Sequence, residues 1–296
     1  PSFTVPSGRG RVWAFDESFS IEQRARPQLF VRSDGVYVMI SGLTSEGTSR
    51  FAMTSNDGIA WTRDVIPYLE PGLFAPLDCG TQLDDAFVAY QPDGSYSAVV
   101  EGVSDPESEG DPLWRKWCRA SSTDAEVFVP DVTGYAFEGS EADAGHPADA
   151  GTLTLADYGV LAYYNSRVTG EDGGIRVAMA AAADLNFVAL SEVDVLPAPA
   201  VEPTPVYLEE GGVRLYYVRG STGGIGMVDL ADGFTPTDDV LALANPDVDC
   251  TALYAECFRD PVVLRLADDR IALYFTRVQV ETDGFSYAIQ RAWAAD

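Results

Sequence analysis

Short apolar runs alternate along the chain with polar turns rich in glycine, aspartate and proline, and helical periodicity is scarce. Runs of this length that contain Val, Leu and Tyr and lie between turn residues are typical of β-strands. The stretch 189–205 is too rich in proline to form a helix. The pattern therefore predicts an all-β protein.

One pattern of two strands recurs five times. In each copy an apolar run ends in an acidic turn, and a second run rich in Val, Leu and Tyr follows. The copies are residues 26–41, 85–100, 149–164, 202–217 and 260–275, and they align on the turn acids Asp34, Asp93, Asp157, Glu210 and Asp268. A spacing of roughly 50–65 residues is enough for a four-stranded propeller blade.

The two-strand pattern continues into a third strand. This strand is visible at residues 49–61, 173–187, 223–234 and 284–293. No residues for a fourth strand follow the last copy, whereas residues 10–15 form a spare strand before the first. We expect this spare strand to complete the fifth blade and close the ring, which removes exposed sheet edges.

The prediction is therefore one five-bladed β-propeller domain over residues 1–296, closed by an N-terminal strand. Its blades should start near residues 26, 85, 149, 202 and 260, each with four antiparallel strands. A β-sandwich is the alternative, but it would not require five copies of one pattern.

The residue eight positions before each turn acid is charged in all five copies. These residues are Arg26, Asp85, Asp149, Glu202 and Asp260. The first strand of a propeller blade is innermost, so these residues should form a ring at one mouth of the central channel. Crowded carboxylates raise one another's pKa values, so such a ring needs a bound cation, a paired arginine or a function.

The first strands resemble those of five-bladed glycoside hydrolases of the furanosidase type, families 43 and 32. Residues 258–261, Phe-Arg-Asp-Pro, resemble the Arg-Asp-Pro motif of the fructan-cleaving family 32. Glu202 resembles the general-acid glutamate on the fourth blade of family 43, and Asp149 falls where that family keeps an aspartate that adjusts the acid. The resemblance implies a pocket in which Glu202, Asp149 and Asp260 are catalytic.

Arg26 departs from this resemblance, because these families place an essential aspartate, as base or nucleophile, at the start of the first blade. Glycoside hydrolysis needs two carboxylates, and an arginine supplies none. Rotation of the ring gives other complete sets of carboxylates. These are Asp85 with Glu202 and Asp260, or Asp260 with Asp85 and Asp149.

Two functions therefore stay open. The first is a glycoside hydrolase-like protein that acts on a neutral oligosaccharide or polysaccharide, with Arg26, Asp85, Arg259 and His146 in contact with the substrate. The second is a non-catalytic propeller that binds carbohydrate or a partner at the same mouth.

The net charge of −27 excludes nucleic acid and anionic membranes as partners. It suits a neutral carbohydrate or a bound cation, although solubility in a salty habitat explains it as well. No cofactor is required, but the carboxylate ring could hold a calcium ion in the central channel. His146 either supports such an ion, contacts substrate or lies in a turn.

Four cysteines, without a Cys-x-x-Cys pair and with a single histidine, argue against a zinc site. Two disulfides fit better, and we favour 79–118 and 250–257 among the three pairings that four cysteines allow. No apolar run approaches the length of a membrane span. We therefore expect a secreted or extracytoplasmic monomer whose leader segment has been removed.

Overall fold

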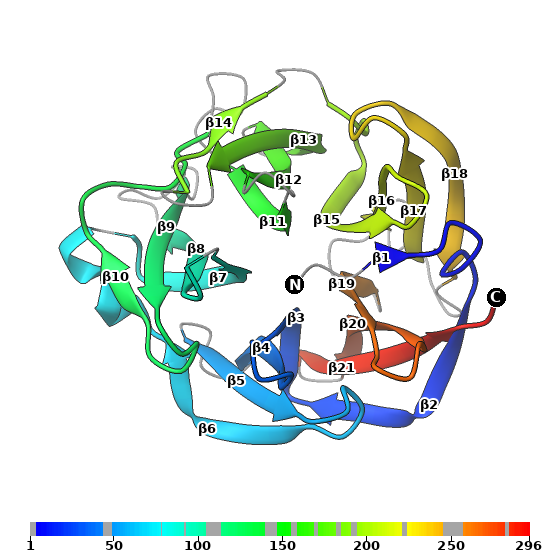
Figure 1. The fold of residues 1–296 in the computed structure, drawn as a ribbon, viewed down its shortest axis with the longest axis horizontal. Coiled ribbons are helices and arrows are strands. Elements are labelled where there is room, and N and C mark those ends of the chain that lie inside the picture. The colour runs from blue at the N-terminus through cyan, green and yellow to red at the C-terminus, as the bar shows by residue number, and fades with distance from the viewer. Residues whose placement is uncertain are drawn as a thin grey trace.

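The computed structural model describes residues 4–43, 49–77, 79–91, 93–104, 114–139, 147–154, 159–168, 171–181, 185–190, 194–220, 224–244, 257–281 and 284–296. Five sheets surround a central axis, as Figure 1 shows, and the predicted five-bladed β-propeller is confirmed. Within the described residues, η1 (Pro71–Leu77), between blades one and two, is a short 3-10 helix.

The blades follow one another in chain order, and each is given from its innermost strand outward. Blade one consists of β3 (Arg24–Val31), β4 (Tyr37–Leu43), β5 (Arg50–Ser55) and β6 (Thr62–Leu69). Blade two consists of β7 (Gln82–Tyr90), β8 (Tyr96–Ser104), β9 (Trp114–Ser122) and β10 (Val129–Asp131). Blade three consists of β11 (Pro147–Thr154), β12 (Gly159–Val168), β13 (Glu171–Ala181) and β14 (Val188–Ala189).

The last two blades also contain the N-terminal strands. Blade four consists of β15 (Ala200–Leu208), β16 (Val213–Arg219), β17 (Gly224–Leu230) and β18 (Pro236–Leu243), with β1 (Thr4–Val5) beside β15. Blade five consists of β19 (Phe258–Arg265), β20 (Ile271–Glu281), β21 (Gly284–Ala294) and β2 (Trp13–Glu22).

The N-terminal strand closes the ring where it was predicted to do so. β2 pairs antiparallel with β21, so that Trp13 lies opposite Ala294. The expectation of four antiparallel strands in every blade is wrong for blade four, because β1 pairs with β15 in parallel, with Thr4 opposite Tyr207. The inner edge of β15 has backbone groups that no other strand of the blade pairs with. The chain passes this edge on its way to β2, so β1 pairs there.

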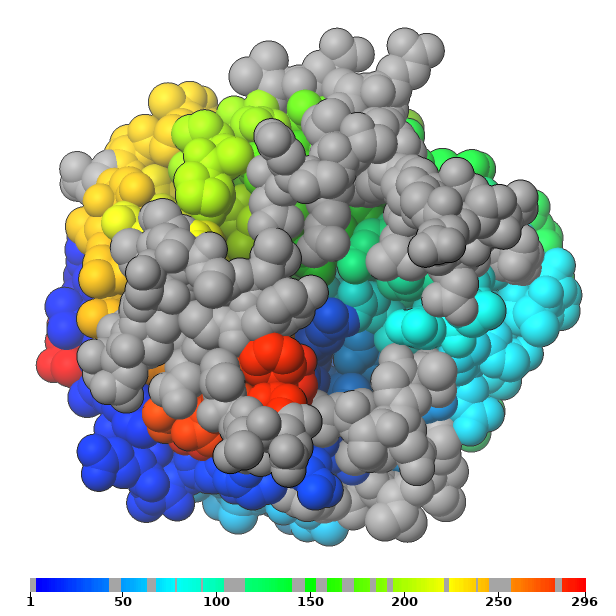
Figure 2. All heavy atoms as spheres, turned by 180° about the vertical axis from the view of Figure 1, so that it is seen from behind, coloured from blue at the N-terminus to red at the C-terminus, as the bar shows by residue number. Residues whose placement is uncertain are grey.

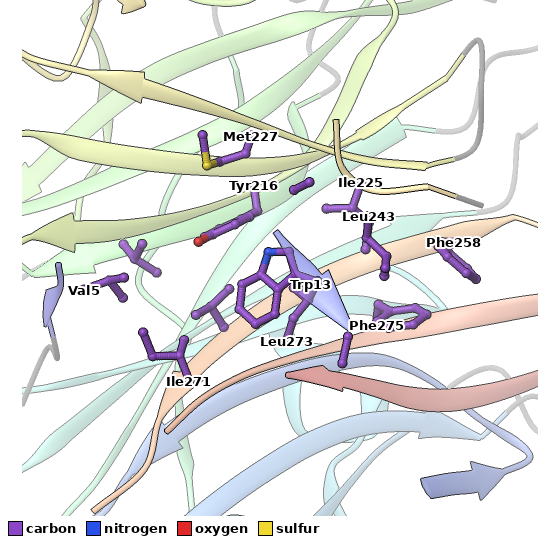
Figure 3. Packing of buried hydrophobic residues seen from close by; sticks show 14 residues of the cluster. Val5, Trp13, Tyr216, Ile225, Met227, Leu243, Phe258, Ile271, Leu273 and Phe275 are labelled. Carbon is purple, nitrogen blue, oxygen red and sulfur yellow. The ribbon is translucent and has the colours of Figure 1, made fainter. Parts of the chain in front are cut away.

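The hydrophobic core is divided among the interfaces between neighbouring blades. Each of the five clusters of buried residues joins two adjacent blades. Figure 3 shows the cluster between blades four and five, where Trp13 packs against Tyr216 with ring centroids 5.7 Å apart. Full burial of one such large side chain contributes about 1.5–3 kcal/mol. The closing strand therefore also completes an interface core.

The recurring turn acids have a local structural role. The carboxylates of Asp34, Asp93 and Asp268 each accept a hydrogen bond from the backbone N–H two residues later. This bond stabilises a tight turn. Glu210 instead accepts a bond from the Ser7 N–H, and Asp157 lies outside the described residues.

The predicted disulfide between Cys79 and Cys118 is confirmed. The other predicted pair includes Cys250, which lies outside the described residues. No helix among the described residues is long and apolar enough to cross a membrane.

Candidate functional site

Every inner strand carries a β-bulge near its start, where its pairing with the second strand shifts register. The shifts lie between Ala25 and Gln28, Leu83 and Ala86, Ala148 and Gly151, Val201 and Thr204, and Arg259 and Val262. The first residue inside the bulge has a left-handed backbone in four blades, with φ of 57° at Arg26, 48° at Asp149, 55° at Glu202 and 49° at Asp260. Each such conformation costs about 1–3 kcal/mol and clusters at functional sites.

Blade two differs from the other four. Its bulge contains Asp84 and Asp85, and neither has a left-handed φ. Asp85 keeps the spacing to the turn acid, but Asp84 takes the first position inside the bulge. The sequence prediction counted eight residues back from the turn acid, so it selected Asp85 and missed Asp84. The two acids are adjacent in the sequence, and this pair was a signal that both could lie in the ring.

Hydrogen bonds across the blade boundaries hold the bulges in place. In each bond the backbone N–H of a ring residue donates to a side chain of the preceding blade. The pairs are Asp149 to Glu101 Oε2 (2.7 Å), Glu202 to Asn165 Oδ1 (3.2 Å), Asp260 to Glu202 Oε2 (2.8 Å) and Arg26 to Thr276 Oγ1 (2.8 Å). The left-handed conformations thus depend on the assembled ring and not on one blade alone.

Asn165, on β12, joins two of the residues that were predicted to be catalytic. It is fully buried. Its Nδ2 donates to Asp149 Oδ2 at 2.9 Å, while its Oδ1 accepts the Glu202 N–H. One end of the amide therefore joins the two inner strands of blade three, and the other end ties blade four to blade three.

Guanidinium groups surround Asp84. Arg115 Nη1 lies 2.7 Å from Asp84 Oδ2 and also contacts Glu101, while Arg50 Nη2 lies 3.3 Å from Asp84 Oδ1. Arg26 forms a further ion pair with Asp84. Residue 42 is glycine, and a Cβ there would lie 2.6 Å from Arg50 Nη1, so a larger residue would force the end of the Arg50 side chain to shift.

Asp85 is buried beside this cluster, and its Oδ1 has no hydrogen-bond partner among the described residues. Burial raises the pKa of Asp85 to about 8, and the charges of Asp149 and Glu101 contribute, while Arg26 opposes them. Burial therefore favours the protonated form of Asp85.

Glu202 and Asp260 form a second pair of buried acids. Burial raises the pKa of Glu202 well above its ordinary value, and the charge of Asp260 raises it further. Arg259 opposes this shift, with Nη1 at 3.6 Å from Glu202 Oε1. Burial also raises the pKa of Asp260, against the opposing effects of Arg26 and a hydrogen bond from Thr276. The site can thus hold both a proton and a negative charge.

The structure brings most of the predicted site residues together. Asp149, Glu202 and Asp260 are joined by the hydrogen bonds above, and Asp85 is buried within electrostatic reach of Asp149 and Asp260. The side chains of Arg26 and Arg259 are 39% and 43% exposed, at the edge of the group. Figure 2 shows the face opposite to that of Figure 1, with residues of blade one, in blue, visible near its centre.

His146 lies outside the described residues. The residues that sequence reasoning missed are Asp84, Glu101, Asn165, Arg50 and Arg115. Except for Asp84, they lie on second or third strands. Glu101 and Asn165 do share a spacing, because each stands eight residues after its turn acid and accepts the backbone N–H of the next blade's ring residue. Arg50 and Arg115 are identified only by their contacts in the assembled ring.

The group that comes nearest to a cation site consists of Asp84, Glu101 and Asp149. One oxygen of each lies within 4.8 Å of the others. However, Arg115 already contacts both Asp84 and Glu101, and Arg26 and Arg50 contact Asp84. A calcium ion would have to displace a buried guanidinium, so this donor set does not fit calcium as it is folded.

No family model and no curated protein matches the chain. Solved structures do match it. A thermostable family-43 glycoside hydrolase is 11% identical, with a TM-score of 0.68, over 95% of this chain and 92% of that one. A family-43 β-xylosidase/α-arabinofuranosidase from a compost microbial metagenome is 14% identical, with a TM-score of 0.64, over 92% and 97%.

A Bombyx mori family-32 β-fructofuranosidase is 12% identical, with a TM-score of 0.67. The match covers 90% of this chain but only 59% of the Bombyx mori chain. At these identities the likeness shows the fold alone, which is that of the five-bladed glycoside hydrolase propellers.

Proposed function

We propose that this protein is a glycoside hydrolase-like propeller that acts on a neutral oligosaccharide outside the cytoplasm. One observation carries the proposal. Four blades each contribute a buried carboxylate to one group, and Glu202 in that group has a pKa raised well above its ordinary value. Burial of several acids in one place is costly for folding and is typical of sites that transfer protons.

Glu202 is the proton donor in this proposal. Cleavage of a glycosidic bond requires a carboxylic acid that protonates the leaving oxygen and a second, ionised carboxylate that activates water or attacks the sugar. Burial and the neighbouring charge of Asp260 keep Glu202 protonated. Its Oε2 accepts the Asp260 N–H at 2.8 Å, which leaves Oε1 to carry the proton.

Asp260 is the ionised partner, since Arg26 occupies the first-blade position. Arg26 and the Thr276 hydroxyl both favour the charged form of Asp260. Asp149 is held by Asn165 and adds negative charge that helps keep Glu202 protonated. A neutral sugar fits this group, because an anionic one would face a protein with a net charge of −27.

Hydrolysis of aryl glycosides and of plant, algal and fructan oligosaccharides tests the proposal. Glu202→Gln should abolish the cleavage of oligosaccharides, whose leaving groups need a proton. It should retain more activity on aryl glycosides with acidic leaving groups. Glu210→Gln, the same change at an exposed turn of the same blade, is the control. Full activity of Glu202→Gln on oligosaccharides would remove Glu202 from the mechanism.

A non-catalytic carbohydrate-binding propeller is the second candidate. Arg26 favours it, because this side chain pairs with Asp84 at the position where the resembling hydrolases keep a catalytic aspartate. Calorimetric binding of an oligosaccharide without any turnover would support this candidate over the enzyme.

A further inference from the structure

Four blade boundaries share one contact, in which the backbone N–H of a ring residue donates to a side chain of the preceding blade. At three of these boundaries the acceptor lies on the second strand, eight residues after the turn acid. These acceptors are Glu101, Asn165 and Thr276. At the fourth boundary, between blades four and five, Val218 stands at this position. A valine side chain cannot accept a hydrogen bond.

Val218 occupies the same place in its blade as these acceptors do in theirs. It pairs with Val201, the residue directly before the ring residue of blade four. Asn165 and Thr276 pair with the corresponding residues of blades three and five. Alternate residues of a strand face the same side, and Tyr216, two residues before Val218, packs in the core between blades four and five. The side chain at position 218 therefore faces blade five, where an acceptor would be needed.

Glu202 supplies the missing acceptor from the first strand of blade four. Its Oε2 accepts the Asp260 N–H at 2.8 Å, and Asp260 has a left-handed backbone with φ of 49°. The boundary between blades one and two shows the alternative. The corresponding residue of blade one, Gly42, offers no side chain, and neither Asp84 nor Asp85 of blade two has a left-handed φ. A left-handed ring residue thus occurs together with an acceptor from the preceding blade.

We propose that the Glu202 carboxylate replaces the missing second-strand acceptor because residue 218 is valine, and that it thereby fastens blade five to blade four. The Asp260 N–H holds Oε2 of Glu202, so it also fixes the direction in which Oε1 points. Val218 is then a positioning residue, which acts on Glu202 by leaving the Asp260 N–H to it. The bond is independent of the reaction that the protein performs, and only its consequence for catalysis rests on the proposed function.

Denaturant unfolding of the full chain with and without Val218→Thr tests the proposal in three backgrounds. These are the wild type, Glu202→Gln, which keeps an acceptor, and Glu202→Leu, which removes it. In the first two the new hydroxyl should reduce the free energy of unfolding, because the Asp260 N–H already has a partner. In Glu202→Leu the hydroxyl gives the Asp260 N–H an acceptor, as Thr276 does for Arg26. There Val218→Thr should be more favourable than in Glu202→Gln by roughly tenfold in the folded-to-unfolded ratio, the size of one unsatisfied buried N–H.

Val278→Thr is the matched control. Val278 and Val218 are each 5% exposed, and both lie on the second strand of a blade. Val278→Thr should change the free energy of unfolding equally in Glu202→Gln and in Glu202→Leu. An equal effect of Val218→Thr in these two backgrounds would overturn the proposal. If Glu202→Leu does not fold, Glu202→Ala takes its place, and failure of Val218→Thr to stabilise or refold either variant would overturn the proposal as well.

Hydrogen exchange of the Asp260 amide, followed by NMR, reports on the bond itself. The amide should exchange slowly in the wild type and in Glu202→Gln. In Glu202→Leu it should exchange roughly tenfold faster, and the addition of Val218→Thr should slow it again. Equal exchange rates in Glu202→Gln and Glu202→Leu would show that Glu202 does not hold this amide.

Catalysis gives a separate readout. If the protein hydrolyses oligosaccharides, Val218→Thr alone should lower kcat with little change in KM, because the new hydroxyl competes for the N–H that orients Glu202. A rise in KM alone would argue against this orienting role. Absence of turnover in the wild type would remove the proposed function, whereas the unfolding and exchange measurements would still decide whether Glu202 fastens the two blades.

Discussion

The channel acids of blade two and those of blades four and five are neutralised in different ways. Around Asp84 and Glu101 there are three arginines, of which Arg50 and Arg115 are buried. Glu202 and Asp260 have beside them the half-exposed Arg259, 3.6 Å from Glu202. Ion pairs hold the first group, whereas burial raises the pKa of Glu202 in the second well above its ordinary value. Burial raises the pKa of Asp85 even beside the first group, so the ion pairs act on Asp84 and Glu101 and not on every acid near them.

Removal of the Glu101 carboxylate should cause the largest loss in the free energy of unfolding. Glu101→Ala leaves the buried Arg115 with one acid fewer and leaves the Asp149 N–H without its acceptor. Breaking a buried ion pair costs about 3–5 kcal/mol, and denaturant unfolding would measure the loss. Glu209→Ala is the control, because Glu209 pairs with Arg265 at 2.5 Å but is 40% exposed. That loss should stay below about 1 kcal/mol, and equal losses would contradict the comparison.

The pH dependence of stability should come next in size. The folded pKa of Asp85 is about 8, above its ordinary value of 3.8, so the folded state binds the proton more tightly than the unfolded state. Its contribution is present below the unfolded pKa and is lost as the pH rises from about 4 through 8, by up to tenfold in the folding equilibrium per pH unit.

Asp85→Asn should therefore reduce the fall in stability between pH 5 and pH 8. Measurement of the unfolding free energy at each pH gives the slope. Asp93→Asn, at an exposed turn of the same blade, should leave the slope nearly unchanged or shift it in the opposite sense, since hydrogen bonds from Ser95 lower the pKa of Asp93. Identical slopes for wild type and Asp85→Asn would show that Asp85 is charged in the fold.

Substitution of Asn165, which lies between the two regions, should reduce the stability of the fold by a smaller amount. Asn165→Ala leaves the Glu202 N–H and Asp149 Oδ2 without their partners, at a cost of about 1–3 kcal/mol. Asn165→Asp keeps an acceptor but sets a negative charge against Asp149, so it should be more harmful at pH 8 than at pH 5. A pH-independent loss in Asn165→Asp would argue against the contact with Asp149.

Arg259 should have the smallest effect on stability. Arg259→Met removes a half-exposed partner of Glu202, so the loss should be below about 1 kcal/mol. The pKa of Glu202 should rise, because Arg259 opposes its shift. Titration of the Glu202 carboxyl by NMR would measure this, and a fall in its pKa would contradict the arrangement.

The sequence predicted features that repeat along the chain and missed features that arise between blades. The turn acids Asp34, Asp93 and Asp268 were visible because each forms the same local turn. Arg115 was not visible, because it acts on neighbouring strands through contacts that the repeat does not mark. Asn165 was missed because its counterparts eight residues after a turn acid, Glu101 and Thr276, are different residue types, although all three accept a cross-blade N–H. The register of blade two was misjudged by one residue, since a bulge can move along a strand without changing the spacing of the turns.

The pairing of β2 with β21 has a consequence for the order in which the protein folds. Blades one to three join strands that follow one another in sequence, and blade four adds only the short β1, whereas blade five joins residues 13–22 to residues 284–294. Contacts of such long sequence separation form slowly, because loop closure must precede them. During synthesis β2 therefore leaves the ribosome long before its partner β21 does. Until then Phe258 and Phe275, in the core between blades four and five, lack the ring of Phe15 that packs against them.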